Sequence, residues 1–130
     1  MMRSRAPISA EIEALAKRAL AEIPAELKRH LGTVVIRVDD FPDEETEAAM
    51  GLESPFDLLG LYRGAPLPHR TPSGAYPATD MIFLFRRPIL EYWCDTGEEL
   101  ADVVRHVLIH EIGHHFGFSD ADMERIENSE

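Results

Sequence analysis

Residue types that bind metals gather near the end of the chain, in the stretch HEIGHHFGFSD at positions 110–120. His110 and His114 are four residues apart, so on an α-helix they project from one face, one turn from each other. Two neutral imidazoles at this spacing can hold one zinc ion. Glu111 lies about 100° round the helix from His110, beside such an ion. Its carboxylate can take a proton from a metal-activated water there, which is the chemistry of the pattern H-E-x-x-H.

A catalytic zinc site needs a third protein ligand and one open position. Asp120 comes six residues after His114, beyond Gly117, where we expect the chain to turn sharply. His110, His114 and Asp120 are therefore the predicted metal ligands. A second interpretation of Asp120 is that an acidic residue is favoured at the start of a helix by the helix dipole. Asp122 is a weaker candidate for the same ligand.

Two further histidines flank the pattern. His115 lies about 140° round the helix from His110, away from the metal face, so we interpret it as a structural histidine, hydrogen-bonded to a carboxylate. His106 lies one turn before His110. A satisfied core histidine is the favoured interpretation of His106, and a partner of the metal ligands is the alternative. Composition does not explain the whole pattern, because H-E-x-x-H with the later glycine and aspartate arises in shuffled chains on the order of once in ten thousand.

The element that must position these residues is a long helix over residues 96–117. Thr96 and Glu99 have the spacing of a capping box at its start, and Gly117 is suited to a left-handed conformation at its end. The apolar residues of this helix occupy an arc that includes or borders His114 and Glu111. We therefore expect the ligands to face the core, in a cleft where the core opens to water.

The rest of the chain is predicted to contain both helices and strands. We predict helices over residues 9–23 (capped by Ser9), 24–32, 43–51 and 119–127 (capped by Ser119), and strands over 33–41, 57–64 and 80–88, the last stopped by Pro88. A loop rich in proline and glycine fills positions 65–78, and a short connector of one or two helical turns follows Pro88. The apolar stripe of the first helix predicts packing on the core of its own domain.

Length and composition describe an ordinary globular protein. The 130 residues predict one domain over positions 1–130, with residues 1–32 as its N-terminal helical segment. The single cysteine, Cys94, fits a reducing compartment, and neither a signal peptide nor a membrane-spanning run is evident, so we expect a cytoplasmic protein without membrane contacts. The net charge of −11 opposes binding to nucleic acid. Arg86 and Arg87 are too few to offset it.

The stretch HEIGHHFGFSD resembles the zincin metallopeptidases, and more narrowly the metzincin pattern H-E-x-x-H-x-x-G-x-x-H/D, with aspartate last as in the snapalysin variant. LLGLYRGAPLPHR, MIFLFRRPILE and VLIHEIGHHFG look like the small bacterial family of zincin-like metallopeptidases. The resemblance implies an α+β fold, a minimal zincin whose small mixed sheet packs on the active-site helix and whose edge strand receives the substrate. It implies zinc on His110, His114 and Asp120, with Glu111 as base. Metzincins place a methionine-containing turn well after the motif, whereas here ten residues follow Asp120 and Met123 falls in a predicted helix, so we do not expect a full metzincin architecture.

The leading hypothesis is a zinc-dependent peptidase acting on peptides or proteins. One alternative is a zincin-fold binding module that turns over poorly. The other is a metal-dependent ribonuclease, which normally carries a third histidine, and both Glu111 and the acidic charge argue against it. The reaction also needs a donor to its oxyanion. The candidate donors are Tyr62, His69, Arg70 and Tyr76.

Overall fold

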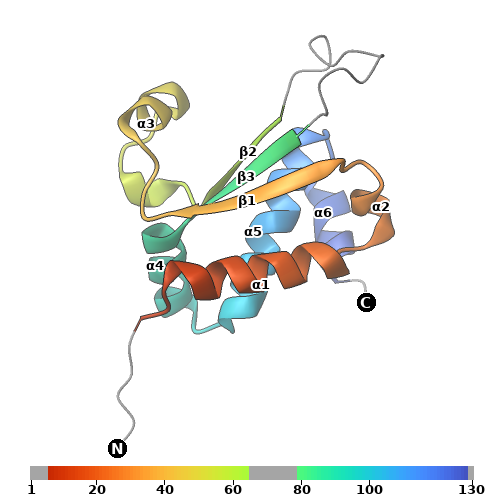
Figure 1. Cartoon of the computed structure of the whole chain (residues 1–130), viewed down its shortest axis with the longest axis horizontal. Coiled ribbons are helices and arrows are strands. Elements are labelled where there is room, and N and C mark those ends of the chain that lie inside the picture. Colours follow the sequence, from red (N-terminus) through yellow and green to blue (C-terminus); the bar gives the residue numbers. More distant parts are fainter. Residues whose placement is uncertain (1–5, 65–78, 129–130) are drawn as a thin grey trace, which may run out of the picture.

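The computed structural model describes residues 6–64 and 79–128. Two helices precede its first strand, and three helices follow its last (Figure 1). The elements are α1 (Ser9–Glu22), α2 (Ala25–Lys28), β1 (Thr33–Asp39), α3 (Glu44–Met50), the 3-10 helix η1 (Pro55–Asp57), β2 (Gly60–Arg63), β3 (Thr79–Phe85), α4 (Arg86–Thr96), α5 (Leu100–His115) and α6 (Asp120–Glu127). The predicted loop at 65–78 lies outside the described residues, and with it His69, Arg70 and Tyr76.

The three described strands form one mixed sheet in the order β1-β3-β2. β1 runs parallel to β3, and Ile36 lies opposite Ile82. β2 runs antiparallel to β3, and Tyr62 lies opposite the same Ile82. All three of these side chains are buried, because alternate residues of each strand point to one face of the sheet. The mixed sheet that the resemblance implied is confirmed.

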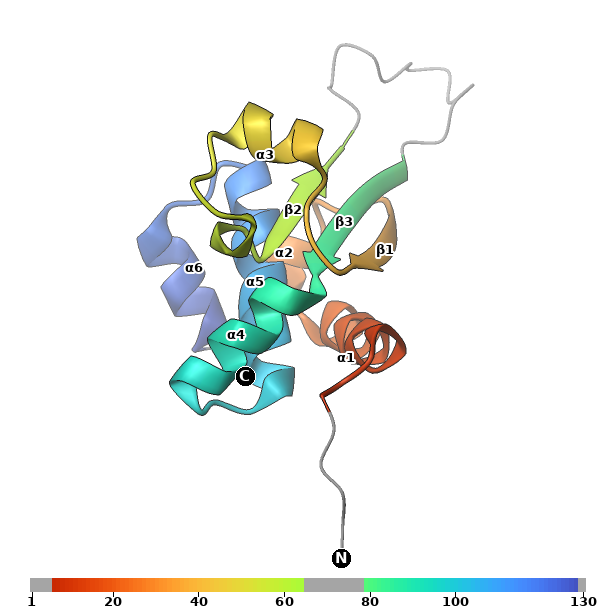
Figure 2. The same cartoon turned by 90° about the vertical axis from the view of Figure 1, so that its left-hand side faces the viewer.

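Helices α1 and α5 cover that buried face of the sheet. Figure 1 shows α1 running beneath β1, and α5 contacts both α1 and β2. Ile12 and Ala16 of α1 and Leu108 of α5 are fully buried in the shared core. In the turned view α6 lies along the flank of α5 (Figure 2). The result is an α+β domain with its motif helix pressed against a small sheet, as expected of a minimal zincin.

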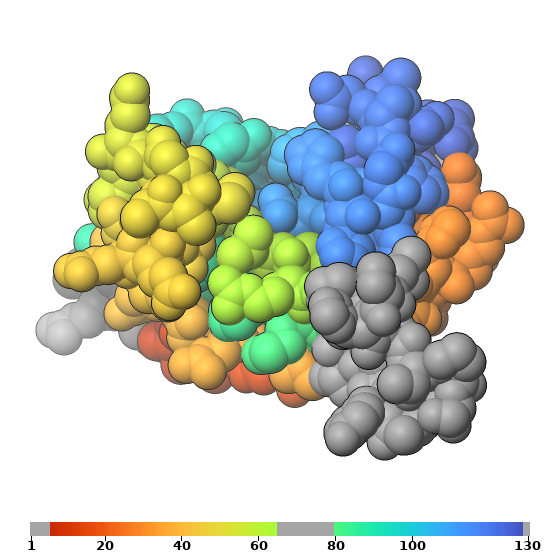
Figure 3. Space-filling model, turned by 90° about the horizontal axis from the view of Figure 1, so that it is seen from above, coloured from red at the N-terminus to blue at the C-terminus, as the bar shows by residue number. Residues whose placement is uncertain are grey.

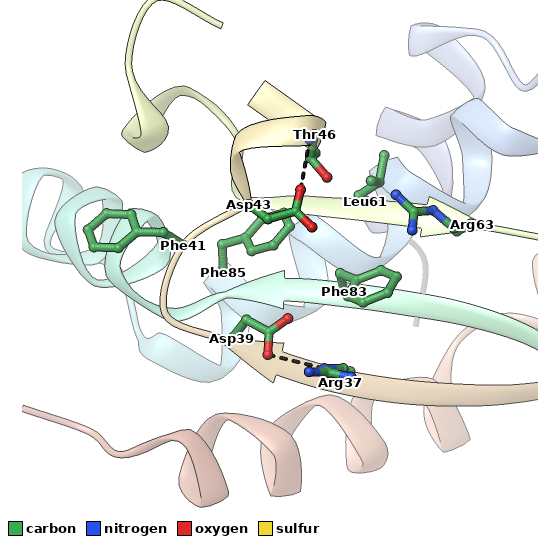
Figure 4. A pocket seen from close by; sticks show the side chains of 9 residues that line it. All are labelled: Arg37, Asp39, Phe41, Asp43, Thr46, Leu61, Arg63, Phe83 and Phe85. Carbon is green, nitrogen blue, oxygen red and sulfur yellow. Dashed lines mark hydrogen bonds and ion pairs between the residues drawn. The ribbon is translucent and has the colours of Figure 1, made fainter. Parts of the chain in front are cut away.

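The opposite face of the sheet carries a cavity of about 270 Å³ beneath the start of α3 (Figure 4). Asp43 caps α3 by accepting a hydrogen bond of 2.7 Å from the backbone of Thr46. On β1, which borders the cavity, Arg37 forms an ion pair with Asp39 at 3.1 Å. The lining residues are Arg37, Asp39, Phe41, Asp43, Thr46, Leu61, Arg63, Phe83 and Phe85. Alternate residues of each strand point to opposite faces of the sheet, and α5 packs on the other face. The cavity is therefore separated by the sheet from the motif on α5.

Several predicted helix and strand ends are wrong. The third strand ends at Phe85, and Pro88 sits in the first turn of α4, where a proline needs no hydrogen-bond donor. The expected short connector is therefore an 11-residue helix. Its final residue is Thr96, because Gly97 takes a left-handed conformation (φ 70°) and ends it. Thr96 accordingly does not cap α5, whose N-cap residue is Glu99.

The first helix also starts differently from the prediction. Ser9 is its first helical residue, and Ile8 occupies the N-cap position. The backbone N–H of Ile8 donates to Glu11 at 3.4 Å. Ser119, by contrast, caps α6 as predicted, accepting from the backbone of Asp122 at 3.0 Å. No helix in the described part of the chain is long and apolar enough to cross a membrane.

Candidate metal centre

His110 and His114 lie on one face of α5 near its C-terminal end. Their ring centroids are 5.9 Å apart and the rings are nearly perpendicular, at 78°. His110 is half-buried, whereas 58% of the His114 side chain is exposed. The pair therefore lies at the rim of the core, more open to solvent than the cleft expected from the helix pattern.

Asp120 returns to this face because the chain reverses sharply after α5. Gly117 has a φ of 80°, and Phe118 donates to the carbonyl of Gly113 at 2.8 Å, which together close the helix end as predicted. α6 begins at once, with Asp120 as its first residue. The Asp120 Oδ1 atom lies 3.8 Å from Nε2 of His114, and the Asp120 side chain is 92% exposed. Neither residue needs to move far to share an ion.

Asp122, the alternative ligand, is committed to another role. Its carboxylate accepts from the backbone of Ser119 at 3.4 Å, and it lies 3.7 Å from Arg125. The hydrogen bond with the Ser119 side chain lowers the pKa of Asp122 most, followed by the Ser119 backbone and then Arg125. The structure therefore brings Asp120, and not Asp122, next to the histidine pair.

Glu111 lies on the side of α5 that faces β2. The backbone N–H of Tyr62 donates to its carboxylate, and His114 stabilises its charge. Burial nevertheless outweighs both contacts and raises the pKa of Glu111 above its ordinary value. A carboxylate with a raised pKa beside a histidine pair has the properties of a general base.

Tyr62 holds β2 against the end of α5. Its hydroxyl donates to the fully buried Asp80 at 2.5 Å, and its ring stacks on His115 with centroids 4.1 Å apart. His115 thus packs on Tyr62, away from the face of His110 and His114, although it is exposed and its described contacts are with rings and not with the expected carboxylate. The Tyr62 hydroxyl is engaged by buried Asp80, which argues against Tyr62 among the four candidate oxyanion donors. Nothing in the sequence around Asp80 predicted this hydrogen bond, because it joins β2 to β3.

His106 lies one turn before His110 on α5, and a carboxylate of α6 lies against both histidines. Oε1 of Glu127, at the end of α6, is 2.5 Å from Nδ1 of His106 and 3.1 Å from Nε2 of His110. The His106 side chain is 42% exposed, so its interpretation as a core histidine is wrong. These three residues form a group that could hold a metal ion. The repeated spacing His106-x-x-x-His110 was a visible signal, whereas Glu127 belongs to another helix.

A comparison with protein families matches most of the chain. The sequence profile described as zincin-like metallopeptidase covers residues 31–129 of the 130-residue chain. The chain belongs to the zincin-like metallopeptidase family. A comparison with curated proteins found no significant match.

Membership of the zincin-like family implies a divalent metal, typically zinc, and the residues present fit one. Two imidazoles and a carboxylate are common ligands of catalytic zinc, and ligand atoms about 2.0–2.1 Å from a tetrahedral ion lie roughly 3.3–3.4 Å apart. The 3.8 Å between His114 and Asp120 is close to that separation. Burial, and then the neighbouring His106, lower the pKa of His110, which keeps its imidazole neutral and able to bind a cation.

This zincin-like chain departs from metzincins in its methionine. Met123 is fully buried in α6 and packs against Gly113, beside the motif helix. It supports the junction of α5 with α6. The described chain thus combines the metzincin-type spacing of the motif with a buried methionine at the junction of α5 and α6.

Proposed function

We propose that the protein is a zinc-dependent peptidase in which His110, His114 and Asp120 hold the metal and Glu111 is the general base. The observation that carries this proposal is the position of Glu111, whose carboxylate is fixed by the backbone of Tyr62 beside His114. Zinc bound there would act as a Lewis acid, polarising the scissile carbonyl and acidifying water.

Glu111 would carry the proton during hydrolysis. Its raised pKa makes it a stronger base than a solvent-exposed glutamate. It would accept a proton from the attacking water and deliver it to the nitrogen of the leaving amine. The hydrogen bond from Tyr62 would keep one carboxylate oxygen oriented through both transfers, and His114 would stabilise the charged form.

The substrate would lie along β2. This strand is at the edge of the sheet, so within residues 6–64 and 79–128 its outer side has no strand partner. Seen from above, β2 is open between α3 and the blue end of α5 and α6 (Figure 3). An extended peptide adding to this edge would pass beside Glu111. The chain's net charge of −11 favours basic peptides, which a comparison of Lys/Arg-rich and acidic peptide libraries would test.

The experiment is peptide hydrolysis by zinc-loaded Glu111→Gln beside wild type. Glutamine keeps the acceptor for Tyr62 and removes the base, so we expect kcat/KM to fall by about 10²–10⁴-fold while zinc content is unchanged. Glu124→Gln, on the exposed surface of α6, is the matched control and should retain wild-type activity. Wild-type cleavage by Glu111→Gln would refute the proposed base. Partner binding that survives Glu111→Gln without loss of cellular function would instead favour a binding module.

A further inference from the structure

A second group of potential ligands lies beside the candidate catalytic site. His106 and His110 are one helical turn apart, and their ring centroids are 4.1 Å apart at an angle of 37°. Oε1 of Glu127 lies against Nδ1 of His106 (2.5 Å) and Nε2 of His110 (3.1 Å). Two imidazole nitrogens and one carboxylate oxygen thus converge from two helices.

The Glu127 oxygen is buried and lacks a hydrogen bond within the described structure. Both ring nitrogens are within ion-pair distance, yet neither forms a hydrogen bond with it. A buried carboxylate oxygen without a hydrogen bond is costly, so such an atom calls for another partner. A cation that accepts electron pairs from the oxygen and both nitrogens would satisfy all three atoms together.

The packing of α6 holds Glu127 in this place. Arg105 of α5 donates to the backbone carbonyl of Glu127 at 2.9 Å. Met123 and Ile126, in the preceding turn, are buried against the core. The carboxylate is therefore presented by an anchored helix end. Around zinc the ligand atoms would need to be roughly 3.3–3.4 Å apart, so Glu127 and His106 would separate by several tenths of an ångström, which a side-chain rotation supplies.

We propose that His106, His110 and Glu127 form a second divalent-cation site, which shares His110 with the motif and replaces His114 by the histidine one turn before His110. We call it the inner site. His110 presents the same Nε2 atom to Glu127 that the catalytic site needs, so the two sites compete for it and an ion held at one excludes full coordination at the other. Occupation of the inner site would hold the cation away from Glu111. The existence of the inner site does not rest on the proposed peptidase activity. The inhibition that would follow from holding the cation away from Glu111 does rest on it.

The test separates the sites by removing the ligand that only the motif uses. Chelator-treated His114→Ala protein is titrated with Zn²⁺ and with Co²⁺, with binding measured by equilibrium dialysis and elemental analysis. We expect one ion per chain. Adding His106→Ala or Glu127→Gln should weaken this binding at least about tenfold, since even residues behind a ligand contribute that much. Adding Glu124→Gln, the matched control on α6, should leave it within about twofold.

Two results would overturn the inner site. One is the absence of ion binding by folded His114→Ala, and the other is binding that His106→Ala and Glu127→Gln leave unchanged, which would reduce the cluster to an ion pair. If a double variant does not fold, the ring nitrogens of His106 are followed by NMR in His114→Ala itself. A zinc-dependent shift at Nδ1 supports the proposal and an unchanged resonance overturns it. Because no substrate is involved, an inactive wild-type enzyme would refute only the peptidase.

Discussion

Gly113 of α5 lies directly against Met123 of α6. A Cβ atom added to Gly113 would come within 2.3 Å of the Met123 sulfur and 2.7 Å of its Cγ, closer than any real contact. The glycine of the motif therefore lets α6 rest on α5. That contact sets the position of both carboxylates, Asp120 at one end of α6 and Glu127 at the other.

Alanine at Gly113 should push α6 away from α5. Because Met123 is fully buried, its side chain has little room to yield, and we expect a loss of about 1–3 kcal/mol in unfolding free energy despite the better helix propensity of alanine. Zinc affinity should fall in the same variant. Urea denaturation and zinc titration measure the two effects.

The partner variant tests whether the clash is the cause. Met123→Ala alone should cost about 2–5 kcal/mol by leaving a cavity. In Gly113→Ala/Met123→Ala the new methyl group occupies part of that cavity, so the combined loss should be smaller than the sum of the two. Strict additivity would show that the two residues do not act through their contact.

The turn after α5 depends on Gly117, which has a φ of 80°. Gly117→Ala should cost about 1–2 kcal/mol, because a Cβ atom is strained in the left-handed region. Gly117→Asn should cost less, since asparagine tolerates that region better than alanine. Thermal unfolding of the two variants checks this order. A larger loss for asparagine would contradict it.

Tyr62→Phe removes the hydroxyl that donates to buried Asp80 at 2.5 Å. The carboxylate of Asp80 then loses a donor, and we expect a destabilisation of about 1–3 kcal/mol by urea denaturation. Tyr92→Phe is the control, because Tyr92 is only half-buried and its contacts with the core and with His106, at 6.4 Å between ring centroids, are made by its ring. Equal losses in the two variants would argue against the Tyr62–Asp80 bond.

The raised pKa of Glu111 makes a stability prediction for the metal-free protein. The pKa in the folded chain exceeds the ordinary value of 4.5 because of burial. The folded protein therefore accommodates Glu111 better in its protonated form than in its charged form. The contribution of protonated Glu111 to the free energy of unfolding is fully present below pH 4.5 and is lost as pH rises through the pKa of the folded state. Glu111→Gln cannot ionise, so its melting temperature should exceed that of wild type at neutral pH, by a margin that shrinks toward pH 4. A margin independent of pH would contradict the shift.

Asp120 and Asp122 separate the two interpretations of the acidic pair. In a Glu127→Gln background, which isolates the motif site, Asp120→Asn should lower zinc affinity at least about tenfold. Asp122→Asn retains an acceptor for the Ser119 backbone and should leave affinity nearly unchanged. Isothermal titration measures both. A larger effect at Asp122 would reverse the assignment.

Local patterns in the sequence predicted the features that depend on neighbouring residues. The spacing of His110 and His114 places them on one face because an α-helix has a fixed period. The left-handed Gly117 and the capping Ser119 follow from backbone sterics and from one hydrogen bond. Such signals fail where two helices adjoin, as at Thr96, since a capping pattern does not show that Gly97 has already ended the preceding helix.

The sequence alone predicted the motif helix and the family pattern, and it supplied the hypothesis that the motif histidines bind metal and Glu111 acts as base. The tertiary structure decided which groups meet them. The burial of Glu111 depends on how β2 packs on α5, and the contact of Glu127 with His106 and His110 depends on how α6 docks at Gly113. Neither contact can be predicted from a local pattern. A contact between two elements depends on how their whole surfaces pack, whereas residue spacing describes the face of one element only.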